Sequence, residues 1–199
     1  MRRLYLASGS PRRAELLDQV AVPFTALRPP GIDETPAGAE TAEAYVQRMA
    51  AEKARAGAEQ LGHNEREAAA VLGADTSVVL ADRILGKPAS AAEATDMLAL
   101  LSGREHRVLS AVSLLWDARQ ETRLSVSTVA FAPLSPALIA RYVASGEPMD
   151  KAGAYGIQGR GAFLIERMDG SYSGVVGLPL RETFALLEQA GILCWATGN

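Results

Sequence analysis

Two adjacent arginines near the start of the chain stand where positive charge is disfavoured. Residues 4–7 are apolar, as in a short buried strand, and Ser10 followed by proline is typical of a helix start. Arg12 and Arg13 therefore fall in the first helical turn, where the helix dipole is already positive. An anion held by the N–H groups of that turn and by the hydroxyls of Ser8 and Ser10 would offset this charge, and the guanidinium fork suits phosphate. The segment predicts a phosphate site; the alternative is a solvated basic turn.

Two carboxylates could serve the same anion. Asp75 interrupts an otherwise apolar run over 71–80, where an ionised group is costly unless it is paired or holds a cation. Asp75 is therefore a candidate metal ligand or general base; the alternative is a strand-end Asp that caps a neighbouring turn. Glu34 lies in a turn-rich segment and alone would be interpreted as a solvated loop residue. Together the two could hold a hard cation such as Mg²⁺, which proteins bind with one or two carboxylates plus substrate phosphates.

Two lysines could extend the positive charge. Lys53 lies on the same face of a long predicted helix as several apolar residues. Its aliphatic chain could pack against the core while the ammonium stays in water, or the ammonium could reach a phosphate. Lys87 follows a predicted hairpin, with a turn at 81–83 and a returning strand at 84–86. That hairpin would bring Lys87 near Asp75 as a phosphate clamp; the alternative is an exposed hairpin lysine.

A glycine-rich loop carries the remaining polar candidate. Residues 153–159 combine glycines with one tyrosine and Gln158, and glycine lets the backbone approach a ligand closely. The Gln158 amide both donates and accepts, so it could pair with a nucleobase edge; a merely flexible loop is the alternative. His106 and Cys194 have no partner at catalytic spacing and are interpreted as structural. This argues against Ser–His or Cys–His nucleophilic chemistry.

Alternating helices and strands would position these groups. The pattern of helices and strands is typical of an α/β protein with a mixed sheet, and the length fits one domain, residues 1–199, with two lobes around that sheet. The chain has neither a Walker-type nor a Rossmann-type glycine motif. Caps and apolar periodicity predict helices from 11, over 41–61, 90–101 and 180–190, and strands over 71–80, 108–116, 123–131, 162–168 and 172–176.

Composition excludes several classes of partner. The net charge is −3 and no basic stripe alternates with aromatic residues, which argues against a nucleic acid polymer; a single nucleotide needs only a local basic cluster. One cysteine cannot form an internal disulfide. The first residues are too short an apolar stretch for a signal peptide, and the longest apolar region, 108–116, is far short of a membrane span. We therefore expect a cytoplasmic protein with no membrane partner.

Eight segments along the chain together carry a resemblance to a known family. They are Ser8-Gly9-Ser10-Pro11-Arg12-Arg13, Asp33-Glu34, Glu52-Lys53-Ala54, Gly73-Ala74-Asp75-Thr76, Gly86-Lys87-Pro88, Leu101-Ser102-Gly103, residues 147–159 and residues 174–180. Taken in order, these segments resemble those of the Maf proteins, a family of nucleoside triphosphate pyrophosphatases, and the resemblance runs nearly end to end. Residues 150–159 resemble the branch that acts on dTTP and UTP, and the branch that acts on 7-methyl-GTP differs in this segment.

The resemblance implies an elongated central sheet flanked by helices, a cleft between two lobes, and a homodimer. It implies that Asp75 is the proton acceptor and that Arg12, Thr76 and Gln158 lie at positions tied to substrate choice. The positions that match acidic and basic groups of the cleft are Glu34, Lys53 and Lys87.

The expected reaction joins these residues in one mechanism. A divalent cation, Mg²⁺ or Mn²⁺, would be held by Glu34 and Asp75, and water would attack the α-phosphorus of dTTP or UTP. The products would be a nucleoside monophosphate and pyrophosphate, in a role that cleanses the nucleotide pool. One alternative is a pyrophosphatase of the same type for modified or purine nucleotides. The other is a nucleotide-binding regulator of cell division that does not turn nucleotides over.

Overall fold

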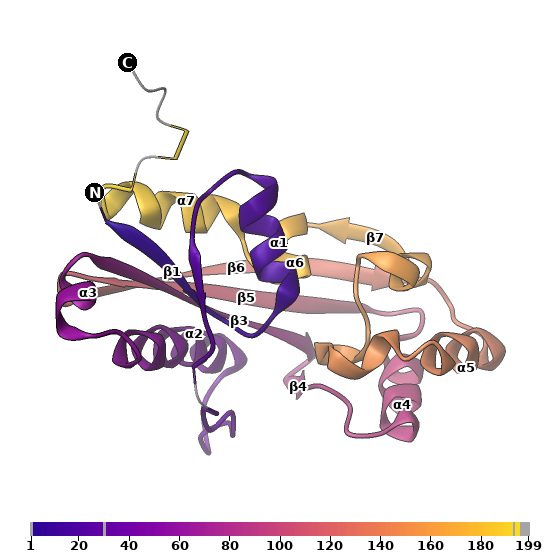
Figure 1. Ribbon diagram of the computed structural model, residues 1–199. Coiled ribbons are helices and arrows are strands. Elements are labelled where there is room, and N and C mark those ends of the chain that lie inside the picture. The colour runs from indigo at the N-terminus through magenta and orange to yellow at the C-terminus, as the bar shows by residue number, and fades with distance from the viewer. Residues whose placement is uncertain (1, 30, 193, 196–199) are drawn as a thin grey trace.

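The computed structural model describes residues 2–29, 31–192, 194 and 195, which form a seven-stranded mixed sheet flanked by helices (Figure 1). Six strands follow the order β2-β1-β3-β5-β6-β7, and β4 pairs with β3 outside this path. The pairs β1–β2 and β1–β3 are parallel, and the others are antiparallel. The strands are β1 (Arg3–Ala7), β2 (Thr25–Leu27), β3 (Ala69–Leu80), β4 (Arg83–Leu85), β5 (Glu105–Trp116), β6 (Arg119–Phe131) and β7 (Ile165–Asp169).

Helices cover both faces of the sheet. In Figure 1, α1, α6 and α7 lie above it and α2 lies below. The face toward α1 and α7 buries a cluster that includes Leu6, Leu72 and Leu114, and α2 packs against Val71 and Leu109 on the other face. The α-helices are α1 (Pro11–Gln19), α2 (Ala42–Glu59), α3 (His63–Glu67), α4 (Ala91–Leu101), α5 (Pro136–Ala144), α6 (Tyr172–Val176) and α7 (Leu180–Gln189), and the 3₁₀ helices are η1 (Glu147–Asp150), η2 (Ala152–Ala154) and η3 (Gly159–Leu164).

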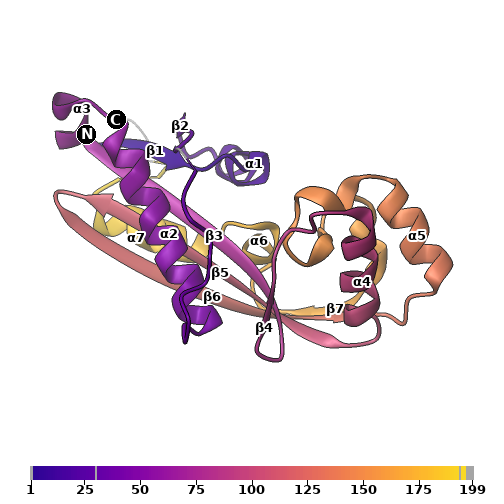
Figure 2. The ribbon, with the colours of Figure 1, turned by 90° about the horizontal axis from the view of Figure 1, so that it is seen from below.

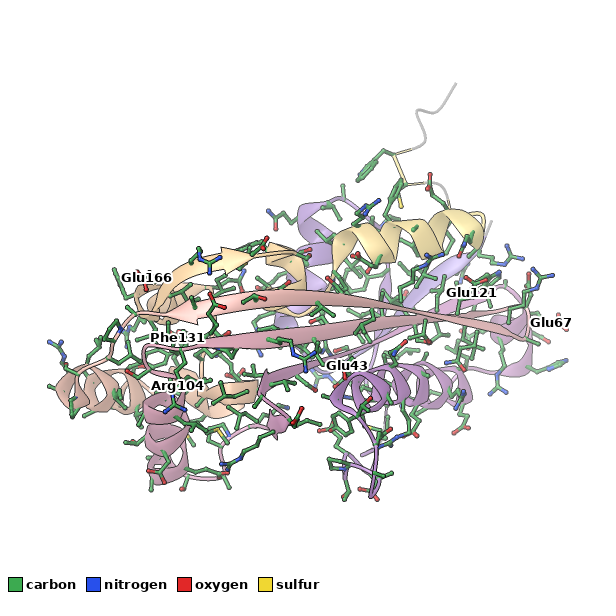
Figure 3. All side chains as sticks on the ribbon, turned by 180° about the vertical axis from the view of Figure 1, so that it is seen from behind. Glu43, Glu67, Arg104, Glu121, Phe131 and Glu166 are labelled. Atoms are coloured by element: carbon green, nitrogen blue, oxygen red, sulfur yellow. The ribbon has the colours of Figure 1, made fainter. Side chains whose placement is uncertain are left out.

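The molecule has two lobes joined by the long strands β3, β5 and β6. The first lobe holds β1, β2, α1, α2 and α7; the second holds β4, β7, α4, α5 and the 3₁₀ helices, around a core that includes Leu98 and Phe131. Figure 2 shows α4 and α5 side by side, apart from α1 and α2. In Figure 3, Phe131 and Arg104 mark the second-lobe end of the sheet, and Glu67 and Glu121 mark the opposite end.

The structure confirms the mixed sheet flanked by helices and most of the predicted elements. Thr41 caps α2, since its hydroxyl accepts from the Ala44 N–H, and Ser90 caps α4 in the same way. Strands β3 and β4 form the predicted hairpin, in which Val78 pairs with Leu85. No helix within the described residues is long and apolar enough to cross a membrane.

Two of the predicted strands were wrong in whole or in part. Residues 172–176 form α6, because the Ser171 hydroxyl accepts from the Gly174 N–H at 3.0 Å and starts a helical turn. The predicted strand over 162–168 begins only at Ile165, because its first residues belong to η3. In both segments, a short apolar run beside glycine suits a tight helical turn as well as a strand.

Candidate active site

A cleft of about 530 Å³ lies between the lobes and gathers all of the predicted site residues. Its walls come from the β1–α1 turn, the middle of β3, the segment after β4, the η2 region and the end of α6. Elements far apart in the chain therefore meet at one place. The predicted residues that line the cleft are Ser8, Ser10, Arg12, Arg13, Glu34, Lys53, Asp75, Thr76, Lys87 and Gln158.

The ammonium of Lys53 lies between the two carboxylates. Its Nζ is 2.6 Å from Asp75 Oδ1 and 2.8 Å from Glu34 Oε1. Asp75 is 8% exposed, so an ionised carboxylate there requires such a partner. The Lys53 side chain thus extends from α2 into the cleft, and its ammonium does not end in bulk water.

A close approach of α2 to β3 makes this pairing possible. A Cβ atom at Gly73 would lie 2.3 Å from the Ala50 carbonyl oxygen and 2.5 Å from the Ala54 nitrogen. Gly73 precedes Asp75 by two residues on β3, and Ala54 follows Lys53 on α2. The missing side chain therefore lets the helix backbone sit against the strand and brings the lysine to the carboxylate.

Charge and backbone contacts hold Glu34 in place although its side chain is 51% exposed. The Tyr45 hydroxyl donates to the Glu34 carbonyl oxygen at 2.9 Å. Partial burial acts to raise the pKa of the Glu34 carboxyl, but the hydrogen bond and charge of Lys53, with the charge of Lys87, outweigh it and lower that pKa. The β3–β4 hairpin thus places Lys87 in the lining of the same cleft as Glu34 and Asp75.

The acidic groups fit a divalent cation only if the substrate supplies further ligands. Among the described residues, no group of three or more His, Cys, Asp or Glu side chains could hold a metal. Two carboxylates do converge on one positive charge, and this oxygen donor set is the kind that Mg²⁺ uses together with phosphate oxygens. Glu34 and Asp75 therefore fit such an ion, and basic residues line the same cleft.

Arg13 is fixed in the wall of the cleft. Its Nε donates to the Gly177 carbonyl at 2.8 Å, one terminal nitrogen donates to Ser8 Oγ at 3.1 Å, and the other lies 3.5 Å from Thr76 Oγ1. Burial lowers the pKa of its guanidinium. Thr76 is in turn 2.9 Å from the Ser110 hydroxyl, which the sequence reasoning did not include. These contacts fix Arg13 and Thr76 in one hydrogen-bonded unit.

The start of α1 differs in one detail from expectation. Ser10 stands at the N-cap, but within the described residues its side chain makes no capping hydrogen bond. The Ser8 hydroxyl instead accepts from the Ser10 N–H at 3.2 Å. The Ser10 hydroxyl therefore does not compete with a ligand for the N–H groups of the first turn, which face an anion in many helices.

Arg12 pairs with a carboxylate from the other lobe, which the sequence reasoning missed. Its guanidinium is 2.8 Å from Asp150 Oδ2, and the Lys151 ammonium is 2.6 Å from Asp150 Oδ1. Partial burial opposes ionisation, but Lys151 and Arg12 lower the pKa of Asp150 to about 2. The only signal in the sequence was that Arg12 and Asp150 each lie in a segment that resembles the Maf family, residues 8–13 and 147–159.

Gln158 lies at the rim of the cleft, and its side chain is exposed. The two groups interpreted as structural lie elsewhere: His106 is buried and pairs with the Tyr155 hydroxyl, and Cys194 packs at the edge of the first-lobe core. Their positions agree with that interpretation.

Comparisons with known proteins identify the family. A family model described as Maf-like protein matches residues 3–190. A "dTTP/UTP pyrophosphatase" of Alcanivorax borkumensis is 58% identical over 96% of this chain and 97% of its own, and one of Aromatoleum aromaticum is 52% identical over 95% and 96%. Among solved structures, a HAM1 protein from Coxiella burnetii aligns with a TM-score of 0.47 at 20% identity, over 67% of this chain and 75% of that chain. The family model and the full-length similarity together show that this chain belongs to the Maf family.

Proposed function

We propose that this protein hydrolyses UTP and dTTP to the nucleoside monophosphate and pyrophosphate. The observation that carries the proposal is the pair Asp75–Glu34 beside Lys53, in a cleft whose remaining wall is rich in cations. Acidic groups at one point and basic groups around it suit a triphosphate whose anhydride bond is to be cleaved. Relatives that are 50–58% identical over nearly the whole chain carry the name dTTP/UTP pyrophosphatase.

In the mechanism, the residues position the triphosphate and accept a proton. Arg12, Lys87 and the start of α1 bind the phosphate chain, because charge neutralisation is the main requirement of phosphoryl transfer. Asp75 orients a water molecule for attack on the α-phosphorus and takes its proton. The new P–O bond forms at the α-phosphorus as the bond to the bridging oxygen breaks, and pyrophosphate leaves. Glu34 and Asp75 would hold Mg²⁺ or Mn²⁺, which neutralises phosphate charge and lowers the pKa of bound water.

Gln158 recognises the base. Uracil and thymine present a carbonyl acceptor at O4 and a donor at N3, and one amide can match both. A rotated amide would match cytosine, so the backbone of the loop around Gln158 must fix its orientation.

A nucleotide panel tests this proposal. UTP and dTTP should exceed ATP and GTP in kcat/KM by at least about tenfold, since a bound base that covers the exposed Gln158 amide and leaves it unpaired costs roughly 1–3 kcal/mol. Gln158→Ala should reduce this preference and leave the cleavage of poor substrates nearly unchanged. Gln19→Ala, at the exposed end of α1, is the matched control. Equal loss for all nucleotides would remove Gln158 from recognition, and a preference for purine or modified nucleotides would reassign the substrate.

Three further expectations complete the proposal. The enzyme acts as a homodimer, it acts in the cytoplasm, and it has no nucleic acid polymer or membrane as a partner. Light scattering after size-exclusion chromatography measures the first directly. Nucleotide binding without pyrophosphate release would instead indicate a regulator without turnover.

A further inference from the structure

The loop that carries Gln158 closes on itself. A Cβ atom at Gly161 would lie 2.1 Å from the Gly156 carbonyl oxygen and 2.7 Å from the Tyr142 hydroxyl. The two ends of segment 156–161 are therefore in contact, and only glycine fits at its second end. Gln158 stands within this closed segment, two residues after its start.

One carboxylate holds the far end of the loop. Glu147 Oε1 accepts from the Gly161 N–H at 2.9 Å, and Oε2 accepts from the Arg160 N–H at 3.1 Å. Gly159 has a φ of +69°, and a Cβ atom there would lie 3.1 Å from Glu147 Oε2. The carboxylate thus packs directly against the residue that follows Gln158.

One hydroxyl holds the near end of the loop and joins it to the same carboxylate. The Tyr142 hydroxyl accepts from the Gly156 N–H at 3.3 Å and donates to Glu147 Oε1 at 3.1 Å. Tyr142 is 5% exposed and packs in the second-lobe core on α5. Partial burial acts to raise the pKa of Glu147, but the N–H groups of Gly161 and Arg160 outweigh it and lower that pKa. The loop is therefore held at its near end by Tyr142 of α5 and at its far end by Glu147 of η1.

We propose that Glu147 and Tyr142 are positioning residues that set the nucleobase specificity of the site by fixing the Gln158 loop. Within the described residues, neither is part of the cleft lining, so both act through the loop rather than on the nucleotide. The inference rests on the proposed function, in which Gln158 reads the base edge. An amide that must match a donor and an acceptor at once needs a fixed orientation, and this pair supplies it.

Glu147→Gln tests the carboxylate. Both oxygens accept hydrogen bonds, so an amide would turn its NH₂ group toward one of these donors. The KM for UTP should rise about tenfold while kcat stays within about threefold, and kcat/KM for ATP should not change, since a displaced loop weakens base recognition only. Tyr142→Phe keeps the buried ring, removes both hydroxyl contacts and should act in the same direction. It also carries the test if Glu147→Gln does not fold.

Glu166→Gln is the matched control. Glu166 is exposed on β7 of the same lobe, at the end of the sheet where Figure 3 also labels Phe131. Its replacement should leave the KM for every nucleotide unchanged.

A double-mutant cycle separates positioning from general stability. In a Gln158→Ala background, Glu147→Gln should cause no further loss of the UTP-over-ATP preference, because both changes remove the same contact with the base. Independent losses, an equal loss for all nucleotides, or an unchanged preference in Glu147→Gln would overturn the inference while the proposed function stands. A wild-type enzyme without a pyrimidine preference would overturn both.

Discussion

At the scale of single residues, the site depends on a lysine that serves two carboxylates of different burial. Asp75 is almost enclosed and Glu34 is half exposed, yet both contact the same ammonium. The buried carboxylate is held in a fixed position, as a proton acceptor must be, and the exposed one is paired with Lys53 but remains accessible to a ligand from solvent. Their different burial therefore matches the different roles that we propose for them.

Asp75→Asn should reduce turnover by at least about 10²-fold, because the amide keeps the shape but cannot accept a proton. Nucleotide binding, measured by calorimetry, should be reduced much less. Asp82→Asn, in the exposed β3–β4 turn, is the control and should leave turnover unchanged. Turnover of Asp75→Asn within a few-fold of the unaltered enzyme would remove Asp75 from the mechanism.

Removal of divalent cations by a chelator should abolish turnover, and added Mg²⁺ should restore it. Glu34→Gln should raise the Mg²⁺ concentration needed for half-maximal rate by at least about tenfold, since one of two charged ligands is lost. The neighbouring Asp33→Asn is the control, because Asp33 accepts from the Thr35 N–H within its own loop. An unchanged Mg²⁺ requirement in Glu34→Gln would exclude Glu34 as a ligand.

At the scale of elements, the contact of α2 with β3 decides where Lys53 lies. Gly73→Ala would push a methyl group into the backbone of α2, at Ala50 and Ala54. Overpacking of this kind costs about 1–3 kcal/mol in the free energy of unfolding, which urea denaturation measures. The turnover rate of the folded protein should also fall, because the displaced helix moves Lys53 away from Asp75. Gly38→Ala, where a Cβ atom meets nothing within 4 Å, should change neither.

The elements could be predicted where local chemistry decides them. Thr41 and Ser90 cap helices in the structure as their sequence positions indicate, because a cap depends on a few neighbouring residues. The segment 172–176 could not be assigned in this way, because its apolar residues fit a strand and the cap at Ser171 turned it into a helix. The register of β3 against β5 depends on contacts between distant segments, which no local pattern contains.

At the scale of the whole molecule, the contacts between the lobes were beyond the sequence reasoning. Every predicted site residue lines the cleft. These residues could be singled out from the sequence because they lie in motifs that resemble those of a known family. The pairing of Arg12 with Asp150 joins residues 138 positions apart. The sequence around either residue does not indicate that the two side chains pair. The residues that line the cleft were thus easier to predict than the residues that pair with them across it.

The stability of the fold should depend on pH through His106. This side chain is 3% exposed in the second lobe, and burial lowers its pKa from 6.5 to about 4. Between these values the unfolded chain binds more protons, so the free energy of unfolding should fall as the pH is lowered from about 6.5 to 4, by about 3 kcal/mol from this group. Comparison with His106→Gln by urea denaturation at each pH isolates this contribution.

His63→Gln is the control for that measurement, because the His63 side chain is 87% exposed and should contribute little. If the unaltered protein and His106→Gln show the same pH dependence, His106 does not titrate differently in the folded and unfolded states.

The position of bond cleavage tests the central claim most directly. UTP is hydrolysed in ¹⁸O-labelled water, and the products are analysed by mass spectrometry. Attack on the α-phosphorus places the solvent oxygen in UMP and leaves pyrophosphate unlabelled. Label in pyrophosphate with none in UMP, or the release of free phosphate and UDP, would contradict the proposed reaction.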